Sequence, residues 1–260
     1  MAPKGTADFA TSIFALFMLA FALLAQADQA PGSGGRNASG KAENPYVVLV
    51  SIDGFSRDYM SIYPTPALDR IAASGIRAES LRPVFPSLTF PNHYSIATGL
   101  YPSEHGIVHN HFPDETRQNW YHLWDRESVE NGRWYGGEPI WVTAEKNGLV
   151  SAAYYFVGTE AAIQGVPPSH WHSFDASVPG DDRVAQVIDW LQWPEDRRPH
   201  LITLYFEHVD TAGHDFGRGS PQLAKAVAEV DAHVGRLLDA IAEQGLDDVV
   251  HVLVVSDHGQ

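Results

Sequence analysis

The sequence contains no cysteine. Disulfides and lipid attachment through a cysteine are therefore excluded, and any metal site must use nitrogen and oxygen ligands. Basic residues are also scarce, since 17 Lys and Arg stand against 32 Asp and Glu and give a formal net charge of −15. This charge provides no basic face for a nucleic-acid backbone, so we expect no nucleic-acid scaffold as a partner. Any phosphate that the protein handles must be held locally.

Long hydrophobic runs are missing apart from residues 13–25. This run is shorter than the roughly 20 apolar residues of a spanning helix, which weakens the alternative of a membrane anchor. Lys4 precedes the run, and Ala25-Gln26-Ala27 follows it with the small residues of a signal-peptidase site. We expect residues 1–27 to be a cleaved signal peptide and residues 28–44, rich in Gly, Ser and Ala, to be a flexible leader. The protein is then periplasmic or secreted, without a stable membrane anchor.

No internal repeat is visible, and the composition, with 44% apolar and 19% charged residues, is typical of a globular protein. Apolar runs alternate with helical patterns along the chain. This alternation predicts an α/β fold with a mostly parallel sheet and helices on both faces. The strands are expected within residues 46–52, 76–84, 149–156, 200–206 and 249–255. The helices are expected at residues 66–74, 139–147, 182–193 and 221–244, and a further helical stretch is expected up to about residue 100.

Acidic residues and histidines follow three of the expected strands, at Asp53, at Asp210 with His214, and at Asp257-His258. Each set has an ordinary explanation when taken alone, because Asp-Gly and Asp-His pairs are common in turns. The carboxyl ends of parallel strands meet at one edge of a sheet, so these side chains are expected to converge. Several buried carboxylates and imidazoles together need a cation. The combination therefore favours a metal site.

Thr89 lies just before the helical stretch expected up to about residue 100, and two interpretations of it remain open. As an N-cap, its hydroxyl would accept a hydrogen bond from a backbone N–H group. Alternatively, a metal lowers the pKa of the hydroxyl and the helix N-terminus attracts a phosphate anion, so that Thr89 becomes a nucleophile.

Five strings occur in the order SIDGF, FPSLTFPNHYSIATGLYPSEHGI, WYGGEPIWVTAEKNG, DTAGH and SDHG. Together they resemble the nucleotide pyrophosphatase/phosphodiesterase (type I phosphodiesterase) family of the alkaline phosphatase superfamily, and its bacterial members in particular. The resemblance extends over residues 46–260 and is carried mainly by the long second string. It implies an alkaline phosphatase-like fold and hydrolysis of phosphodiester or pyrophosphate bonds.

The resemblance also implies two zinc ions as cofactors and Thr89 as the nucleophile that forms a phosphothreonine intermediate. It assigns the ligands of the first ion as Asp53, Asp257 and His258, with Thr89 also in contact. The second ion would be held by Asp210, His214 and a further histidine.

For the substrate, the resemblance implies a small-molecule nucleotide or another phosphodiester. Asn110 matches an asparagine that binds a nonbridging phosphoryl oxygen. Phe90 and Tyr205 match rings that sandwich a nucleobase, although either ring could equally be part of the core. Trp134, Tyr135 and Trp141 could wall the pocket, with core packing as the alternative.

The family's catalytic domain continues past SDHG. We therefore expect residues 45–260 to be a truncated catalytic domain with its C-terminal part missing and the last zinc-ligand histidine beyond residue 260. Otherwise a histidine already present, such as His105, His109 or His111, must complete the second site. Two alternatives remain, an alkaline phosphatase-like phosphomonoesterase and an inactive protein that binds zinc or nucleotide. No Lys or Arg lies close to Thr89 in the sequence to bind a dianionic monoester, which favours diesters.

Overall fold

The computed structural model describes residues 35–41 and 43–260. The predicted signal peptide and the first part of the expected leader lie outside these residues. No helix in the described part of the chain combines the length and the apolar character that crossing a membrane requires.

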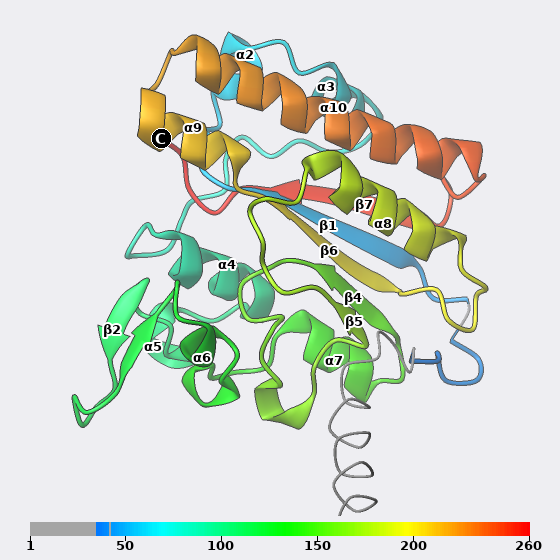
Figure 1. The fold of residues 1–260 in the computed structure, drawn as a ribbon. Helices are drawn as coiled ribbons and strands as arrows, with labels where there is room; N and C mark the ends of the chain where they lie inside the picture. The colour runs from blue at the N-terminus through cyan, green and yellow to red at the C-terminus, as the bar shows by residue number, and fades with distance from the viewer. Residues whose placement is uncertain (1–34, 42) are drawn as a thin grey trace, which may run out of the picture. The chain divides into compact units, whose positions relative to one another are not determined.

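A five-stranded sheet forms the centre of the domain, with all of its strands parallel (Figure 1). The strand order is β5-β4-β6-β1-β7. The strands are β1 (Tyr46–Ile52), β4 (Ser151–Tyr154), β5 (His170–Trp171), β6 (Leu201–Phe206) and β7 (Val250–Val255). The predicted fold class, a mostly parallel sheet covered by helices, is confirmed.

The central strand β1 shows why the sheet is buried on both faces. It pairs with β6 on one side and β7 on the other, so that Val48 lies between Ile202 and Val252. Val48 and Val50 pack into one hydrophobic cluster, whereas Leu49 packs into a second one. Alternate residues of a strand point to opposite faces, and a strand covered on both faces is therefore apolar throughout.

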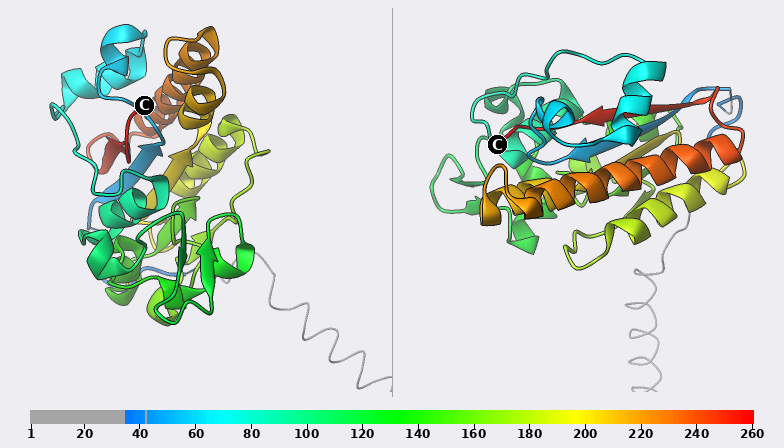
Figure 2. Two further views of the ribbon diagram at one scale, coloured as in Figure 1. Left: turned by 90° about the vertical axis from the view of Figure 1, so that its left-hand side faces the viewer. Right: turned by 90° about the horizontal axis from the view of Figure 1, so that it is seen from above.

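Helices cover both faces of the sheet (Figure 2). The first cluster is closed by α3 (Pro66–Ser74), α8 (Gly180–Gln192) and α10 (Pro221–Glu243). The second cluster is closed by α4 (Thr89–Thr98) and α7 (Ile140–Lys146). The remaining elements are α2 (Tyr59–Ile62), α5 (Pro102–His105), α6 (Arg126–Val129), α9 (His208–Phe216), η2 (Gly132–Trp134), η3 (Ile163–Gly165), β2 (His111–Pro113) and β3 (Trp120–His122).

The strand expected within residues 76–84 is absent from the structure. Residues 75–83 are exposed along their whole length, and Ile76 is 96% exposed. A strand is stable only where a neighbouring strand satisfies its N–H and C=O groups. Among the described residues, none forms a ladder with this segment. Its apolar residues therefore predicted a strand that has no partner here.

An antiparallel hairpin of β2 and β3 was not predicted. Phe112 of β2 and Tyr121 of β3 face inward and stack with ring centroids 5.0 Å apart. Each strand has only three residues, which is too short for an alternating pattern to stand out in the sequence. The hairpin follows directly after Asn110, so its packing fixes where that residue lies.

Residues 36–38, within the segment expected to be a leader, bond to the folded domain. The Asn37 amide donates to the carbonyl oxygens of Glu195 and Arg198, and its own oxygen accepts from the Val150 N–H. The backbone N–H of Ala38 donates to the Gly148 carbonyl at 2.8 Å. The ordered domain therefore includes residues upstream of position 45.

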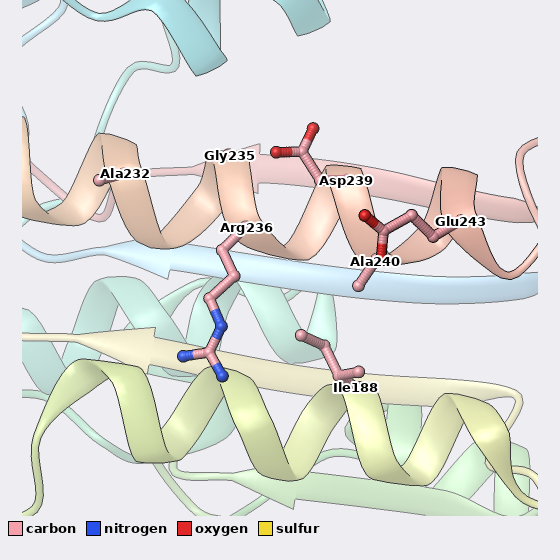
Figure 3. A pocket seen from close by; sticks show the side chains of 7 residues that line it. All are labelled: Ile188, Ala232, Gly235, Arg236, Asp239, Ala240 and Glu243. Atoms are coloured by element: carbon pink, nitrogen blue, oxygen red, sulfur yellow. The ribbon is translucent and has the colours of Figure 1, made fainter.

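A hollow of about 550 Å³ opens between α8 and α10 (Figure 3). Ile188 forms one wall, and the other carries small residues together with Arg236, Asp239 and Glu243. None of the residues predicted to act in catalysis lines it. The hollow is therefore a groove between two covering helices, separate from the candidate active site.

Candidate active site

Two neighbouring strands bring the first predicted ligand set together. Asp53 follows β1 and Asp257 follows β7, and these strands pair directly. His258 Nε2 lies 3.5 Å from Asp53 Oδ1 and 3.3 Å from Asp257 Oδ2. One ligand atom from each of the three residues lies within 4.8 Å of the others. Their arrangement follows from the parallel topology, because both strands end at the same edge.

The carboxylates of this set are buried and incompletely paired. Asp53 and Asp257 are each only 2% exposed. Asp53 Oδ1 and Asp257 Oδ2 accept no well-aligned hydrogen bond from the described residues, although imidazole nitrogens lie within ion-pair distance. A buried unpaired carboxylate oxygen costs free energy that a cation recovers. Two carboxylates and one imidazole also form a donor set that suits zinc, so these residues fit such an ion.

The electrostatics of the pair also favour a positive charge. Burial, reinforced by the negative charge of Asp257, raises the pKa of Asp53 well above its usual value. For Asp257, burial acts in the same direction, but the imidazoles of His93 and His258 outweigh it and lower its pKa to about 2. One carboxylate thus takes up a proton more readily while the other remains ionised. A bound cation would replace that proton.

The second predicted ligand set lies on α9, which follows β6. Asp210 and His214 are one helical turn apart, with Oδ2 and Nε2 separated by 3.5 Å. Asp210 packs so closely on the loop after β1 that a Cβ atom at Gly54 would lie 2.8 Å from Asp210 Oδ1. The two sets are therefore adjacent. Within the described residues, three ligand atoms converge only around Asp53, so the second set offers two ligands.

His105 is unsuited to complete the second set. Its Nδ1 accepts a hydrogen bond from the Ile107 N–H at 3.2 Å, and its Nε2 lies 2.9 Å from the Ser95 hydroxyl. The lone pair of the accepting nitrogen is used, and the other nitrogen is occupied by serine. Both ring nitrogens are therefore committed to the core.

Thr89 is the first residue of α4, and the N-cap is Leu88 in an extended conformation. Thr89 therefore does not hold the capping position, and Leu88 provides no side-chain cap. The Thr89 hydroxyl instead lies 3.5 Å from His258 Nε2. The hydroxyl thus faces the first ligand set from the N-terminus of a helix, where backbone N–H groups and the helix dipole favour an anion.

Asn110 reaches the start of the same helix. Its Oδ1 accepts a hydrogen bond from the Phe90 backbone N–H at 3.1 Å. Its own carbonyl accepts from the Leu123 N–H at 3.0 Å, which ties it to the hairpin. Because the amide oxygen is held in this way, the NH₂ group of Asn110 remains as a donor beside Thr89.

The two rings expected to sandwich a base differ in their surroundings. The Phe90 ring is half-buried and meets Tyr121 edge-on at 5.9 Å. The Tyr205 hydroxyl donates to Asp53 Oδ2 at 2.6 Å. Burial and the adjacent carboxylate raise the pKa of Tyr205, so its hydroxyl stays protonated and able to donate. Base stacking by Phe90 and Tyr205 stays a prediction, and the structure gives Tyr205 an additional contact with a predicted metal ligand.

The aromatic residues expected as possible pocket walls also differ in how deeply they are buried. Trp141 is 1% exposed and packs edge-on against Phe156, which supports the core alternative. Tyr135 is also buried, and its hydroxyl donates to the Val129 carbonyl, so the core alternative holds for it as well. Trp134 is half-buried and packs on Phe112 and Tyr121.

Sequence reasoning missed two residues beneath this site, Ser51 and His93. Both are fully buried, and the Ser51 Oγ lies 2.8 Å from His93 Nε2. The available signals were a serine inside an otherwise apolar strand and a histidine one turn into the helix that Thr89 begins. Each signal is weak without knowledge of which strand the helix covers.

The hydrogen bond from Tyr205 to Asp53 can be removed while the ring is kept. We expect Tyr205→Phe to lower zinc affinity about 10-fold, because it removes a hydrogen bond to a ligand while leaving the ring. The affinity is measured by competition with a chelating dye. Tyr155→Phe is the control, since its hydroxyl bonds the Asp175 carbonyl instead. Unchanged zinc affinity in Tyr205→Phe would show that the hydrogen bond to Asp53 does not support a metal.

The fold and the site together define an alkaline phosphatase-like α/β protein. Side chains suited to bind a cation lie at its strand ends, and a threonine hydroxyl lies beside them at a helix N-terminus. The family described as type I phosphodiesterase / nucleotide pyrophosphatase matches residues 47–260. The chain belongs to this family.

Characterised relatives agree with this assignment. The chain is 40% identical over 219 residues to human ectonucleotide pyrophosphatase/phosphodiesterase family member 1, covering 84% of this chain and 24% of that protein. It is 36% identical over 234 residues to the venom phosphodiesterase CdcPDE of Crotalus durissus collilineatus, covering 89% of this chain and 28% of the enzyme. The chain thus spans about a quarter of the length of these relatives.

Solved structures show the same fold. Murine ectonucleotide pyrophosphatase/phosphodiesterase 5, as an inactive threonine-to-alanine variant in complex with AMP, superposes with a TM-score of 0.77 at 32% identity, covering 84% of this chain and 57% of that one. The human protein of the same name gives a TM-score of 0.77 at 33% identity, covering 82% and 57%.

Proposed function

We propose that the protein hydrolyses phosphodiester or pyrophosphate bonds, chiefly of nucleotides, through a covalent intermediate on Thr89 and with two zinc ions as cofactors. The observation that carries this proposal is the placement of the Thr89 hydroxyl. It lies at the N-terminus of α4 and 3.5 Å from His258, beside two carboxylates with unpaired buried oxygens. Relatives named phosphodiesterases and nucleotide pyrophosphatases support the reaction class.

Five residues would hold the two ions. Asp53, Asp257 and His258 would bind the first ion, and Asp210 and His214 would contribute to the second. When bound, such ions lower the pKa of a coordinated hydroxyl and offset the negative charge of a phosphate.

The protein's own groups account for the two chemical steps. The Thr89 oxygen attacks phosphorus and gives its proton to solvent, while the bond from phosphorus to the leaving oxygen breaks and that oxygen takes up a proton from solvent. Water then splits the threonine ester and restores the Thr89 hydroxyl. The Asn110 NH₂ group and the backbone N–H of Thr89, at the start of α4, would donate to the nonbridging oxygens. These donors are already in place, since Asn110 is held by the Phe90 N–H.

We also propose that the enzyme acts outside the cytoplasm, in the periplasm or after secretion. The signal-like N-terminal segment supports this, as do relatives whose names mark them as ectoenzymes or venom enzymes. The partner is then a small-molecule nucleotide or another phosphodiester.

The proposal is tested by comparing substrates with zinc in excess, so that a weak second site is also filled. We expect kcat/KM for the nitrophenyl ester of thymidine 5′-phosphate to exceed that for nitrophenyl phosphate by at least about 100-fold. Rapid quenching and mass spectrometry should find the intermediate on Thr89. A preference for the monoester would favour the phosphomonoesterase instead. Zinc binding without turnover of either substrate would favour the inactive binding protein.

Phe90→Ala tests base recognition. Stacking on an aromatic ring contributes about 1–3 kcal/mol per base, so we expect KM for the nucleotide ester to rise about 10-fold. The KM for methyl nitrophenyl phosphate, which has no base, should change little. Phe85→Ala is the control, because Phe85 is 91% exposed and precedes the helix. Equal losses for both substrates would mean that Phe90 supports the site structurally.

A further inference from the structure

A histidine beneath the site connects the three elements that build it. His93 is fully buried, and its ring lies between Ser51 of β1, Thr89 at the start of α4 and Asp257 after β7. These elements carry the nucleophile and the first predicted ligand set.

Both ring nitrogens of His93 are engaged. Nδ1 lies 2.9 Å from the Thr89 carbonyl oxygen and 3.3 Å from Asp257 Oδ2. Both neighbours are acceptors, so Nδ1 carries a hydrogen whatever the charge of the ring. Nε2 lies 2.8 Å from the Ser51 hydroxyl, which can either donate or accept. The arrangement therefore holds for a neutral and for a charged imidazole.

The contacts of Asp257 show what His93 adds. Asp257 Oδ1 accepts from the Gly54 N–H at 3.2 Å, while Oδ2 lies against His93 and His258. The backbone hydrogen bond and the imidazoles within ion-pair distance together restrict the rotation of the carboxylate. Removing a side chain that orients a metal ligand in this way commonly lowers metal affinity or activity about 10–100-fold.

We propose that His93 is a positioning residue that holds the backbone of Thr89 and the carboxylate of Asp257 in a fixed relation, with Ser51 anchoring its ring to the sheet. The role in turnover rests on the proposed function, whereas the role in orienting Asp257 does not. His93 would act through these neighbours and would not touch the substrate.

The chain contains a matched pair that lacks these contacts. Ser95 lies on the same helix, and its hydroxyl is 2.9 Å from Nε2 of the buried His105. The other nitrogen of His105 accepts from the Ile107 N–H and reaches neither Thr89 nor Asp257. Variants of this pair report what losing a buried serine–histidine contact does to stability alone.

Three variants of His93 separate its hydrogen bonds. His93→Phe keeps a ring for the edge-on contacts with Phe156 and Tyr205 but removes both nitrogens. His93→Asn keeps a donor near Nδ1, and His93→Gln keeps a polar group near Nε2. Each is compared with wild type and with His105→Phe for zinc affinity, kcat, KM and melting temperature.

We expect His93→Phe and His93→Gln to lower zinc affinity and kcat about 10–100-fold with little change in KM, and His93→Asn to recover most of the loss. His105→Phe should lower the melting temperature alone. If His93→Phe does not fold, the contrast between His93→Asn and His93→Gln carries the test, and Ser51→Ala should show a smaller loss of the same kind.

Two outcomes would overturn the proposal. The first is unchanged zinc affinity in His93→Gln. The second is a loss in all His93 variants that simply follows the melting temperature, as in His105→Phe. Because zinc affinity needs no substrate, a fall in affinity together with an active Thr89→Ala enzyme would preserve the positioning of Asp257 while rejecting the proposed nucleophile.

Discussion

Thr89→Ala is expected to lower kcat for a nucleotide diester by at least about 10³-fold, because it removes the proposed nucleophile. Zinc affinity should change little, since all the predicted protein ligands remain. Turnover is measured with a nitrophenyl nucleotide in excess zinc, and bound metal is measured on the same preparation.

Thr98→Ala provides the control for this change. Thr98 is also half-buried and lies at the opposite end of α4, where its hydroxyl donates to the Tyr94 carbonyl at 2.7 Å. Its replacement should leave kcat unchanged. Thr89→Ser, which retains a hydroxyl, should keep measurable turnover. Near wild-type hydrolysis by Thr89→Ala would reduce Thr89 to a structural residue of the helix.

Asp257→Asn is expected to lower the zinc affinity of the first ligand set by more than about 100-fold. A loss of that size is the upper end for residues that only orient a ligand, and Asp257 is predicted to be a ligand itself. The amide keeps the shape of the side chain but loses the charge that the ion requires. Adding zinc should raise the melting temperature of the wild type and much less that of the variant. At a free concentration of 100 Kd, a ligand adds about 2.7 kcal/mol to the free energy of unfolding.

The wild type should also release its zinc in two steps under a chelator. The ion at Asp210 and His214 should leave first, because catalytic zinc sites usually have three protein ligands. Asp231→Asn is the control for Asp257→Asn, since Asp231 is also buried but accepts from the N–H groups of Ala67 and Leu68. It should destabilise the fold without changing zinc stoichiometry. Equal zinc affinities in the wild type and Asp257→Asn would contradict the ligand assignment.

Much of the fold could be predicted from local pattern. Strand β1 matches its predicted bounds, and α10 ends within one residue of its predicted end. Continuous apolar runs and terminal Pro or Gly residues determine such elements locally. The segment 76–84 failed because strand formation depends on a partner, which its own residues do not encode.

The site could be predicted only as far as strand ends reveal it. The positions of Asp53 and Asp257 could be predicted, because each residue follows an apolar run that was expected to be a strand of the same parallel sheet. The hydrogen bond from Tyr205 to Asp53 could not be predicted, because it depends on the strand register that pairs Tyr205 with Ser51. The same register places Ser51 and Tyr205 on the sheet face that His93 covers. No local sequence pattern identifies that face.

The close approach of Gly54 to Asp210 restricts how this sequence can change. Gly54 has a φ of +66°, and any Cβ there would lie within 2.9 Å of Asp210 backbone and side-chain atoms. A substitution would therefore be strained and would also push α9 away from the end of β1. A side chain at position 54 is thus compatible with this fold only if α9 is displaced at the same time, which would also move Asp210 relative to Asp53.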